Sequence, residues 1–187
     1  MVVSIFFLYL HKQLNICIMK FELKSIKFIE EMSEETNCFY GKLYINKKFV
    51  ADVRNDGQGG CTWVQPINKL SGMITQNANE WLASQPKKKS DMYDFEYIRT
   101  LESEVDDLFA DWLEIKETKK LEKKMEKGIL YGNKYHYQMV YWTNTTLTAL
   151  LNNPIGKARV TKLIHELTEK GETILNTNIP TECYPTK

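Results

Sequence analysis

The chain has 187 residues, of which 43% are hydrophobic, and this composition excludes a wholly disordered protein. Its 25 lysines and arginines nearly balance its 24 aspartates and glutamates, so the net charge of +1 excludes an overall attraction to nucleic acid or to an anionic membrane. The four cysteines lack the close spacing of a zinc site or of a small disulfide scaffold, which favours a reduced, cytoplasmic protein.

The first 18 residues contain an apolar run from Val2 to Leu10 that is too short to span a bilayer. No basic segment precedes this run, as a signal peptide would require. We therefore interpret residues 1–18 as an extension from a misplaced gene start, with translation beginning at Met19. The alternatives are a strand or helix that packs on the core and, less favoured, a membrane anchor. Residues 19–187 are expected to form a single domain without a membrane partner.

Residues 21–64 are predicted to form an antiparallel β-meander of about four short strands. In the run FYGKLYI, Phe39, Leu43 and Ile45 fall on one face and polar or aromatic residues on the other, which is the two-residue period of a half-buried strand. Asn46 and Lys47 are predicted to form a hairpin turn into the next strand, KKFVADV.

Beyond this meander the apolar spacing becomes helical. A first helix is predicted from the spacing of Ile67, Leu70, Ile74 and Trp81. The clearest helix follows, with apolar residues at steps of three and four: Ile98, Leu101, Val105, Leu108, Trp112 and Ile115, widened by Phe109 and Leu113. Its acidic residues precede its lysines, which suits the helix dipole, and it should end near Gly128. We expect its first half to pack on the meander and its lysine-rich half to project into solvent.

The C-terminal part is predicted to be mainly helical, with strands near residues 135–142 and 173–176. A helix after Pro154 has an apolar stripe and should end at Gly171 in the C′ position. The fold class expected from all these elements is α+β: an N-terminal antiparallel β-meander packed against helices, with one long, amphipathic, charged helix.

The stretch RNDGQGGCTW contains the first candidate site. Its residues are Asn55, Asp56, Gly57, Gln58, Gly59 and Gly60. Thr62 stands where a dinucleotide fingerprint needs its third glycine, so that function is excluded. A tight turn with left-handed glycines is the favoured interpretation. The alternative is a ligand site, in which backbone amides bind an anion or the polar side chains contact a ligand.

The sequence contains no motif that is specific to a catalytic site or a metal site, and no cofactor is expected. His136 and His165 are far apart, and neither a G-x-S-x-G nor an H-E-x-x-H motif is present. Tyr135, Tyr137 and Tyr141 alternate in one run and could stack nucleic-acid bases, but we favour a covered tyrosine face because the chain lacks a basic excess.

A second candidate site is the lysine run of the long helix. If an acidic partner binds, we expect contact with Lys119, Lys120, Lys123 and Lys124, although a solvated helix face is the commoner use of such a run.

The stretch ELKSIKFIEEMSEETNCFYGKLYINKKFVADVRNDGQGGCTW resembles the N-terminal region of a loosely defined group of uncharacterised small proteins of phages and other mobile elements, and GETILNTNI resembles their C-terminal part. The shared pattern is SEET…LYINxKxVxxVxNDGxGG. This chain differs at Lys47, where the group often has glycine, and at Gln58, where it often has histidine. The resemblance implies a protein of the bacterial host's cytoplasm but no particular activity, and a histidine-dependent role of the loop does not fit this chain.

Two functional hypotheses follow. The favoured one is a non-enzymatic phage or mobile-element accessory protein that binds a host or phage macromolecule, with a protein partner favoured over nucleic acid. The alternative is a small enzyme, or a nucleotide- or anion-binding protein, that uses the loop from Asn55 to Gly60. The sequence identifies neither a specific partner nor an oligomeric state.

Overall fold

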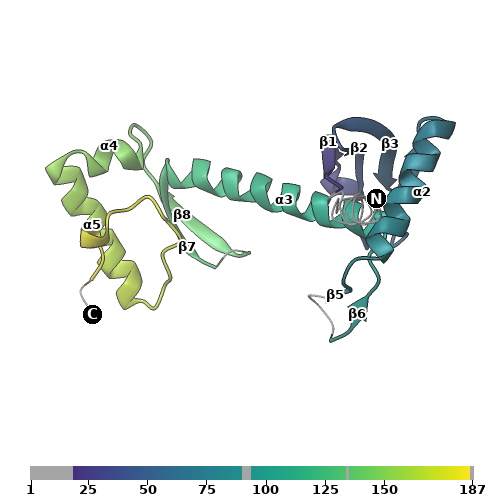
Figure 1. Ribbon diagram of the computed structural model, residues 1–187. Helices are drawn as coiled ribbons and strands as arrows, with labels where there is room; N and C mark the ends of the chain where they lie inside the picture. The colour runs from purple at the N-terminus through teal and green to yellow at the C-terminus, as the bar shows by residue number, and fades with distance from the viewer. Residues whose placement is uncertain (1–18, 90–93, 134, 186–187) are drawn as a thin grey trace, which may run out of the picture. The chain divides into compact units, whose positions relative to one another are not determined.

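The computed structural model describes residues 19–89, 94–133 and 135–185, and in these ranges the chain is an α+β protein, as its sequence predicts (Figure 1). An antiparallel sheet packs against helices, and one helix is much longer than the others described. The segment 1–18, which we interpret as an N-terminal extension, lies outside the described residues.

The chain divides into two compact units, Met1–Asp111 and Trp112–Lys187. The long helix α3 (Leu101–Met125) contributes to both, because the division falls within it. The single domain expected for residues 19–187 therefore stays a prediction.

The first unit is built on a four-stranded sheet with the strand order β1-β2-β3-β4. Its strands are β1 (Phe21–Phe28), β2 (Phe39–Ile45), β3 (Lys48–Asn55) and β4 (Trp63–Pro66). Each strand pairs antiparallel with the next one in the chain, which is the meander that the sequence predicts. The alternation also holds in β2, where Phe39, Leu43 and Ile45 are buried while Tyr40 and Lys42 are exposed.

The connection between β2 and β3 is the two-residue turn predicted at Asn46 and Lys47. Both residues have positive φ angles, 50° and 67°, as a type I′ turn requires. A left-handed backbone costs a residue with a Cβ atom about 1–2 kcal/mol, and glycine avoids most of this cost. Glycine at position 47 would therefore suit the turn better than lysine.

Replacing Lys47 with glycine is expected to raise the free energy of unfolding by about 0.5–1 kcal/mol, because glycine relieves the left-handed strain while it adds entropy to the unfolded chain. The measurement is urea unfolding followed by tryptophan fluorescence. Lys48→Gly is the control, since Lys48 is paired in β3 and glycine weakens a strand. Equal losses of stability in the two variants would contradict the expectation.

Helix α3 packs on the sheet inside the first unit, as predicted for its first half. The Phe109 ring stacks on Phe39, with centroids 4.0 Å apart and an interplanar angle of 11°, and it also contacts the ring of Phe28. Leu101 and Val105 precede Phe109 at steps of four residues and are buried with it. In Figure 1 the strands β1 to β3 lie beside the first turns of α3.

The buried stripe of α3 is rotated relative to the predicted one. Ile98 precedes the helix and is exposed, and Ile115 is exposed as well. Phe109, which was predicted at the margin of the stripe, is 2% exposed and lies at its centre. The flat stack with Phe39 accounts for the rotation, because it directs the Phe109 side of the helix toward β2.

Helix α2 (Lys69–Ala83) exists as predicted, but the apolar residues whose spacing predicts it are not its buried residues. Leu70 is 67% exposed, and Ile67 is exposed too. The buried residues are Ser71, Thr75, Ala78 and Leu82. Small side chains let α2 approach β3 and β4 closely, so local sterics outweigh the hydrophobicity on which the prediction relied.

Three short elements complete the first unit: η1 (Glu30–Met32), β5 (Lys88–Lys89) and β6 (Glu96–Tyr97). β5 and β6 pair with each other in a segment for which the sequence predicts only a surface connection. An ion pair between Lys88 Nζ and Asp107 Oδ1, 2.6 Å apart, joins β5 to α3.

The second unit begins with the lysine-rich end of α3, which stops at Met125 rather than near Gly128. Gly128 opens the strand β7 (Gly128–Gly132), which pairs antiparallel with β8 (Tyr137–Tyr141). The strand β8 matches the one predicted near residues 135–142. The strand β7 is not predicted from the sequence, because its five residues, GILYG, show no clear alternation of apolar and polar side chains.

Two helices cover the core of the second unit, α4 (Leu147–Leu151) and α5 (Pro154–Glu169), and η2 (Thr181–Cys183) follows them. The buried cluster consists of Ile129, Leu147, Val160, Ile164, Leu167, Ile179 and Cys183. Helix α5 ends as predicted: Gly171 has a φ of 81°, and its amide donates to Thr168 O. The Glu172 amide donates to Leu167 O, which completes a Schellman motif.

The segment after Gly171 returns to β7, close to the strand predicted at residues 173–176. It forms one antiparallel bridge, Tyr131 to Ile174, and the Leu175 amide donates to Leu130 O at 2.9 Å. The pairing is shorter than the predicted strand. In Figure 1 this yellow segment runs between α5 and the β7–β8 hairpin.

Candidate functional site

The glycine-rich loop between β3 and β4 is organised by the side chain of Asn55. The Asn55 Oδ1 atom accepts from Thr36 Oγ1 at 2.8 Å and from the Gly57 amide at 3.0 Å. Its Nδ2 atom donates to Gly60 O and to Thr62 Oγ1. Asn55 is buried, so its amide group acts as an internal support of the loop.

Gly57 has the left-handed backbone that the sequence predicts, with a φ of 84°, and Gly59 is left-handed as well, with a φ of 79°. Gly57 O accepts from three successive amides, those of Glu34, Glu35 and Thr36. The Gly59 amide donates to Thr36 Oγ1 at 3.3 Å. The loop is thus closed against the segment that follows η1.

This geometry bears on the proposed ligand role of the loop. The amides of Gly57 and Gly59 both donate inside the protein, so an anion would have to displace these bonds. Asp56 and Gln58 are exposed and lie beside the bonded amides. The geometry favours the turn interpretation, and the ligand role stays a prediction.

The loop is linked to α3 by Thr62, whose hydroxyl donates to the Asp106 carboxylate. Partial burial raises the pKa of Asp106 above its ordinary value, and the hydrogen bond from Thr62 opposes this rise. The negative charges of Asp107 and Glu102 also raise the pKa of Asp106. The Asp106 side chain keeps contact with solvent. Its structural role is to accept the hydrogen bond from Thr62, which ties the loop to α3.

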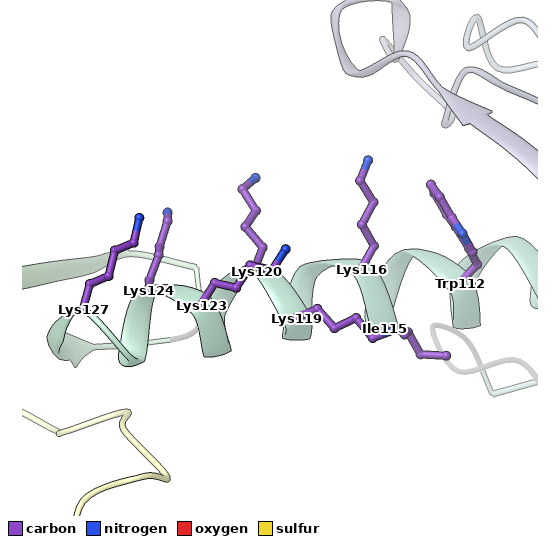
Figure 2. A pocket seen from close by; sticks show the side chains of 8 residues that line it. All are labelled: Trp112, Ile115, Lys116, Lys119, Lys120, Lys123, Lys124 and Lys127. Carbon is purple, nitrogen blue, oxygen red and sulfur yellow. The ribbon is translucent and has the colours of Figure 1, made fainter. Parts of the chain in front are cut away.

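The second candidate site is a helix surface that we call the lysine face. It consists of Trp112, Ile115, Lys116, Lys119, Lys120, Lys123, Lys124 and Lys127. Figure 2 shows Lys116, Lys120, Lys124 and Lys127 extending to the same side of α3 as Trp112. The hollow among these side chains has a volume of about 640 Å³. Seven of the residues lie on α3 and Lys127 follows just after its end, so the hollow is a surface groove rather than an enclosed ligand cleft.

The predicted partner-binding lysines differ in their surroundings. Lys119, Lys120 and Lys123 are exposed, and Lys120 Nζ lies 3.6 Å from Glu117 Oε2. Lys124 is half-buried, and its ammonium group donates to the Tyr137 hydroxyl and lies 4.9 Å from the centroid of that ring. Lys124 therefore takes part in the fold of the second unit, which the charge pattern alone does not indicate.

A third surface, which sequence reasoning missed, is the outward face of the four-stranded sheet. Trp63 is 59% exposed and Tyr40 is 39% exposed, and both lie on this face with Arg54 between them in register. The available signal was the strand alternation itself, because residues out of phase with Phe39 and Leu43 must face outward.

The other residues considered in the sequence remain dispersed. Tyr135 and Tyr141 are exposed, so the covered tyrosine face that we favoured does not form at these two positions. Over residues 19–89, 94–133 and 135–185, no group of three or more His, Cys, Asp or Glu side chains has a metal-binding arrangement.

The helices in the described part of the chain are all too short or too polar to cross a bilayer.

No protein-family model, curated protein or solved structure is significantly similar to the chain.

Proposed function

We propose that the chain is a non-enzymatic accessory protein of a phage or mobile element, and that it binds an acidic protein in the cytoplasm of the bacterial host. The observation that supports this function is the lysine face of α3, where ammonium groups gather beside an exposed isoleucine. The phage or mobile-element origin rests on the sequence resemblance of the N-terminal strands.

The composition of the lysine face favours an acidic protein as its partner. Lys116 and Lys124 are eight residues apart on α3, so the lysines extend along about 12 Å of helix at 1.5 Å per residue, and Lys127 follows after the end of the helix. Ile115 is exposed at the end that also carries Trp112, and buried aromatic and aliphatic anchors are typical of protein interfaces. Complementary charge around such an anchor raises the association rate and fixes orientation.

The test is a charge-reversal variant, Lys119→Glu/Lys120→Glu/Lys123→Glu, that leaves out the half-buried Lys124. We expect its Tm to stay close to that of the parent, because the three side chains are exposed. Binding should be lost. The readout is quantitative mass spectrometry of proteins captured from host lysate, followed by a titration of the purified candidate.

The matched control makes the same charge change on α5 and at the residue that follows it, Arg159→Glu/Lys162→Glu/Lys170→Glu, where all three side chains are also exposed. A genuine partner is retained by this control and lost with the lysine-face variant. If every captured protein responds equally to both variants, the proposal fails. A large fall in Tm in the lysine-face variant would instead show that the face is packed structure.

A small enzyme or anion-binding protein using the loop from Asn55 to Gly60 was the alternative. In this loop the amides of Gly57 and Gly59 already donate to acceptors within the protein, so they are not free to bind an anion. We therefore retain the binding protein as the single proposed function.

A further inference from the structure

The outward face of the sheet in the first unit carries two rows of side chains that cross all four strands. In the first row Lys27 is in register with Tyr40, Tyr40 with Arg54, and Arg54 with Trp63. Neighbouring strands are about 4.8 Å apart, so this row extends over about 14 Å. One row therefore brings together a lysine, two aromatic rings and an arginine from four different strands.

The aromatic part of this row is open to solvent and already holds a cation. The Arg54 guanidinium carbon lies 5.3 Å from the centroid of the Trp63 ring. Tyr40, Arg54 and Trp63 line a hollow of about 400 Å³. The floor of this hollow is β3, because Asp52 and Val53 also line it. The rings thus border a shallow depression rather than standing singly on the surface.

The second row supplies polar groups next to the rings. Here Lys24 is in register with Lys42, Lys42 with Asp52, and Asp52 with Gln65. Asp52 and Gln65 line the same hollow as the aromatic rings. A carboxylate and an amide provide hydrogen-bond acceptors and donors beside a stacking surface. This is the combination with which single-stranded bases are held by their faces and edges.

A β-bulge places a second cation at the β1 edge. The register of β1 shifts between Lys24 and Lys27, and Ser25, inside the shift, has a φ of 53°. Because one extra residue is inserted there, both lysines are exposed although they are three positions apart. The bulge thus adds Lys27 to the side of the face opposite Trp63.

From this arrangement we infer that the outward sheet face binds single-stranded nucleic acid, with bases stacked on Trp63 and Tyr40 and with the phosphate backbone directed toward Lys27 and Lys42. This site is separate from the lysine face and does not depend on the proposed function.

Three features favour a nucleic-acid strand over other occupants. Bases in a duplex are already stacked on each other, so exposed rings on a sheet require unpaired bases. The cations at β1 lie about three strand spacings from Trp63, so a chain of nucleotides suits the row better than a single nucleotide. A protein with a net charge of only +1 can still bind a single strand by stacking, because each stacked base adds binding energy through its ring.

The test is fluorescence anisotropy of a labelled 12-nucleotide oligothymidine, titrated with the whole protein at low salt. Trp63→Ala and Tyr40→Ala should each weaken binding about 5- to 100-fold, the loss expected for one base–aromatic stack. Trp63→Phe keeps a ring and should retain most of the affinity. Tyr141→Ala removes an equally exposed aromatic ring from the second unit, 64% exposed, and should leave binding unchanged.

An abasic oligomer of the same length is the second probe, and we expect it to bind at least about fivefold more weakly than oligothymidine. Equal binding of the two probes would show a purely electrostatic contact and overturn the inference. Absence of oligothymidine binding would overturn it as well. The same holds if Lys119→Glu/Lys120→Glu/Lys123→Glu abolishes binding while Trp63→Ala does not, because binding would then belong to the lysine face.

Circular dichroism of every variant shows whether a loss of binding comes from unfolding, and the Trp63→Phe result decides the matter if Trp63→Ala is unfolded.

Discussion

Replacing Gly57 with valine is expected to lower the free energy of unfolding by about 3 kcal/mol or more, because the change combines backbone strain with a steric clash. Gly57 has a φ of 84°, which a β-branched residue rarely adopts. A Cβ atom at this position would lie 2.1 Å from Met32 O and 2.9 Å from Cys38 Cβ. Since Gly57 O also accepts three amides, the loop cannot move away without losing those bonds.

The control for this variant is Gly60→Val in the same loop. A Cβ atom on Gly60 would meet no other atom within 4 Å, and Gly60 is not among the glycines with positive φ. Urea unfolding of both variants, followed by circular dichroism, measures the difference. A Gly57→Val protein as stable as the parent would show that the glycine is not required by the backbone and would strengthen the ligand role of the loop.

Replacing Asn176 with alanine should have an effect of similar size in the second unit, about 3 kcal/mol, because several buried groups would lose their partners at once. The Oδ1 atom of Asn176 accepts from the Leu130 amide at 2.7 Å. Its Nδ2 atom donates to Met125 O and Gly128 O, and to the side chain of Asn178. The Leu130 amide would remain buried without an acceptor in the variant.

Asn178→Ala is the matched control, because Asn178 is exposed and donates one bond to Met125 O at 3.1 Å. We expect this change to cost less than about 1 kcal/mol. Hydrogen exchange adds a local readout, since the Leu130 amide should exchange much faster in Asn176→Ala than in Asn178→Ala. Unchanged exchange at Leu130 would disprove the clamp by Asn176.

The sequence predicts the sheet well and the helix faces less well. The two-residue alternation and the turn at Asn46 are local signals, so they survive in the folded chain. The buried face of α2 depends on how closely the helix approaches the sheet, and small residues such as Ala78 decide this. The helical spacing of apolar residues such as Leu70, which is exposed, does not show how closely the helix approaches the sheet.

The candidate sites show the same division. Left-handed glycines at Gly57 and Gly59 are predictable from composition, but their partners Thr36 and Glu34 come from a distant segment. The lysine run is visible in the sequence, whereas the bond between Lys124 and the β7–β8 hairpin is not. The outward row on the sheet requires the register of four strands, which no single strand pattern supplies.

The clamp made by Asn176 has a consequence for folding during synthesis. Asn176 and Met125, whose carbonyl it binds, are 51 residues apart in the chain. At the usual 5–20 residues per second, a ribosome needs about 3–10 s to make that stretch. During this interval residues Gly128–Gly132 have been synthesised, whereas Asn176, whose side chain accepts from the Leu130 amide in the folded protein, has not. The second unit therefore cannot complete this clamp until several seconds after its first strand has been made, whereas the sheet of the first unit pairs only strands that are neighbours in the chain.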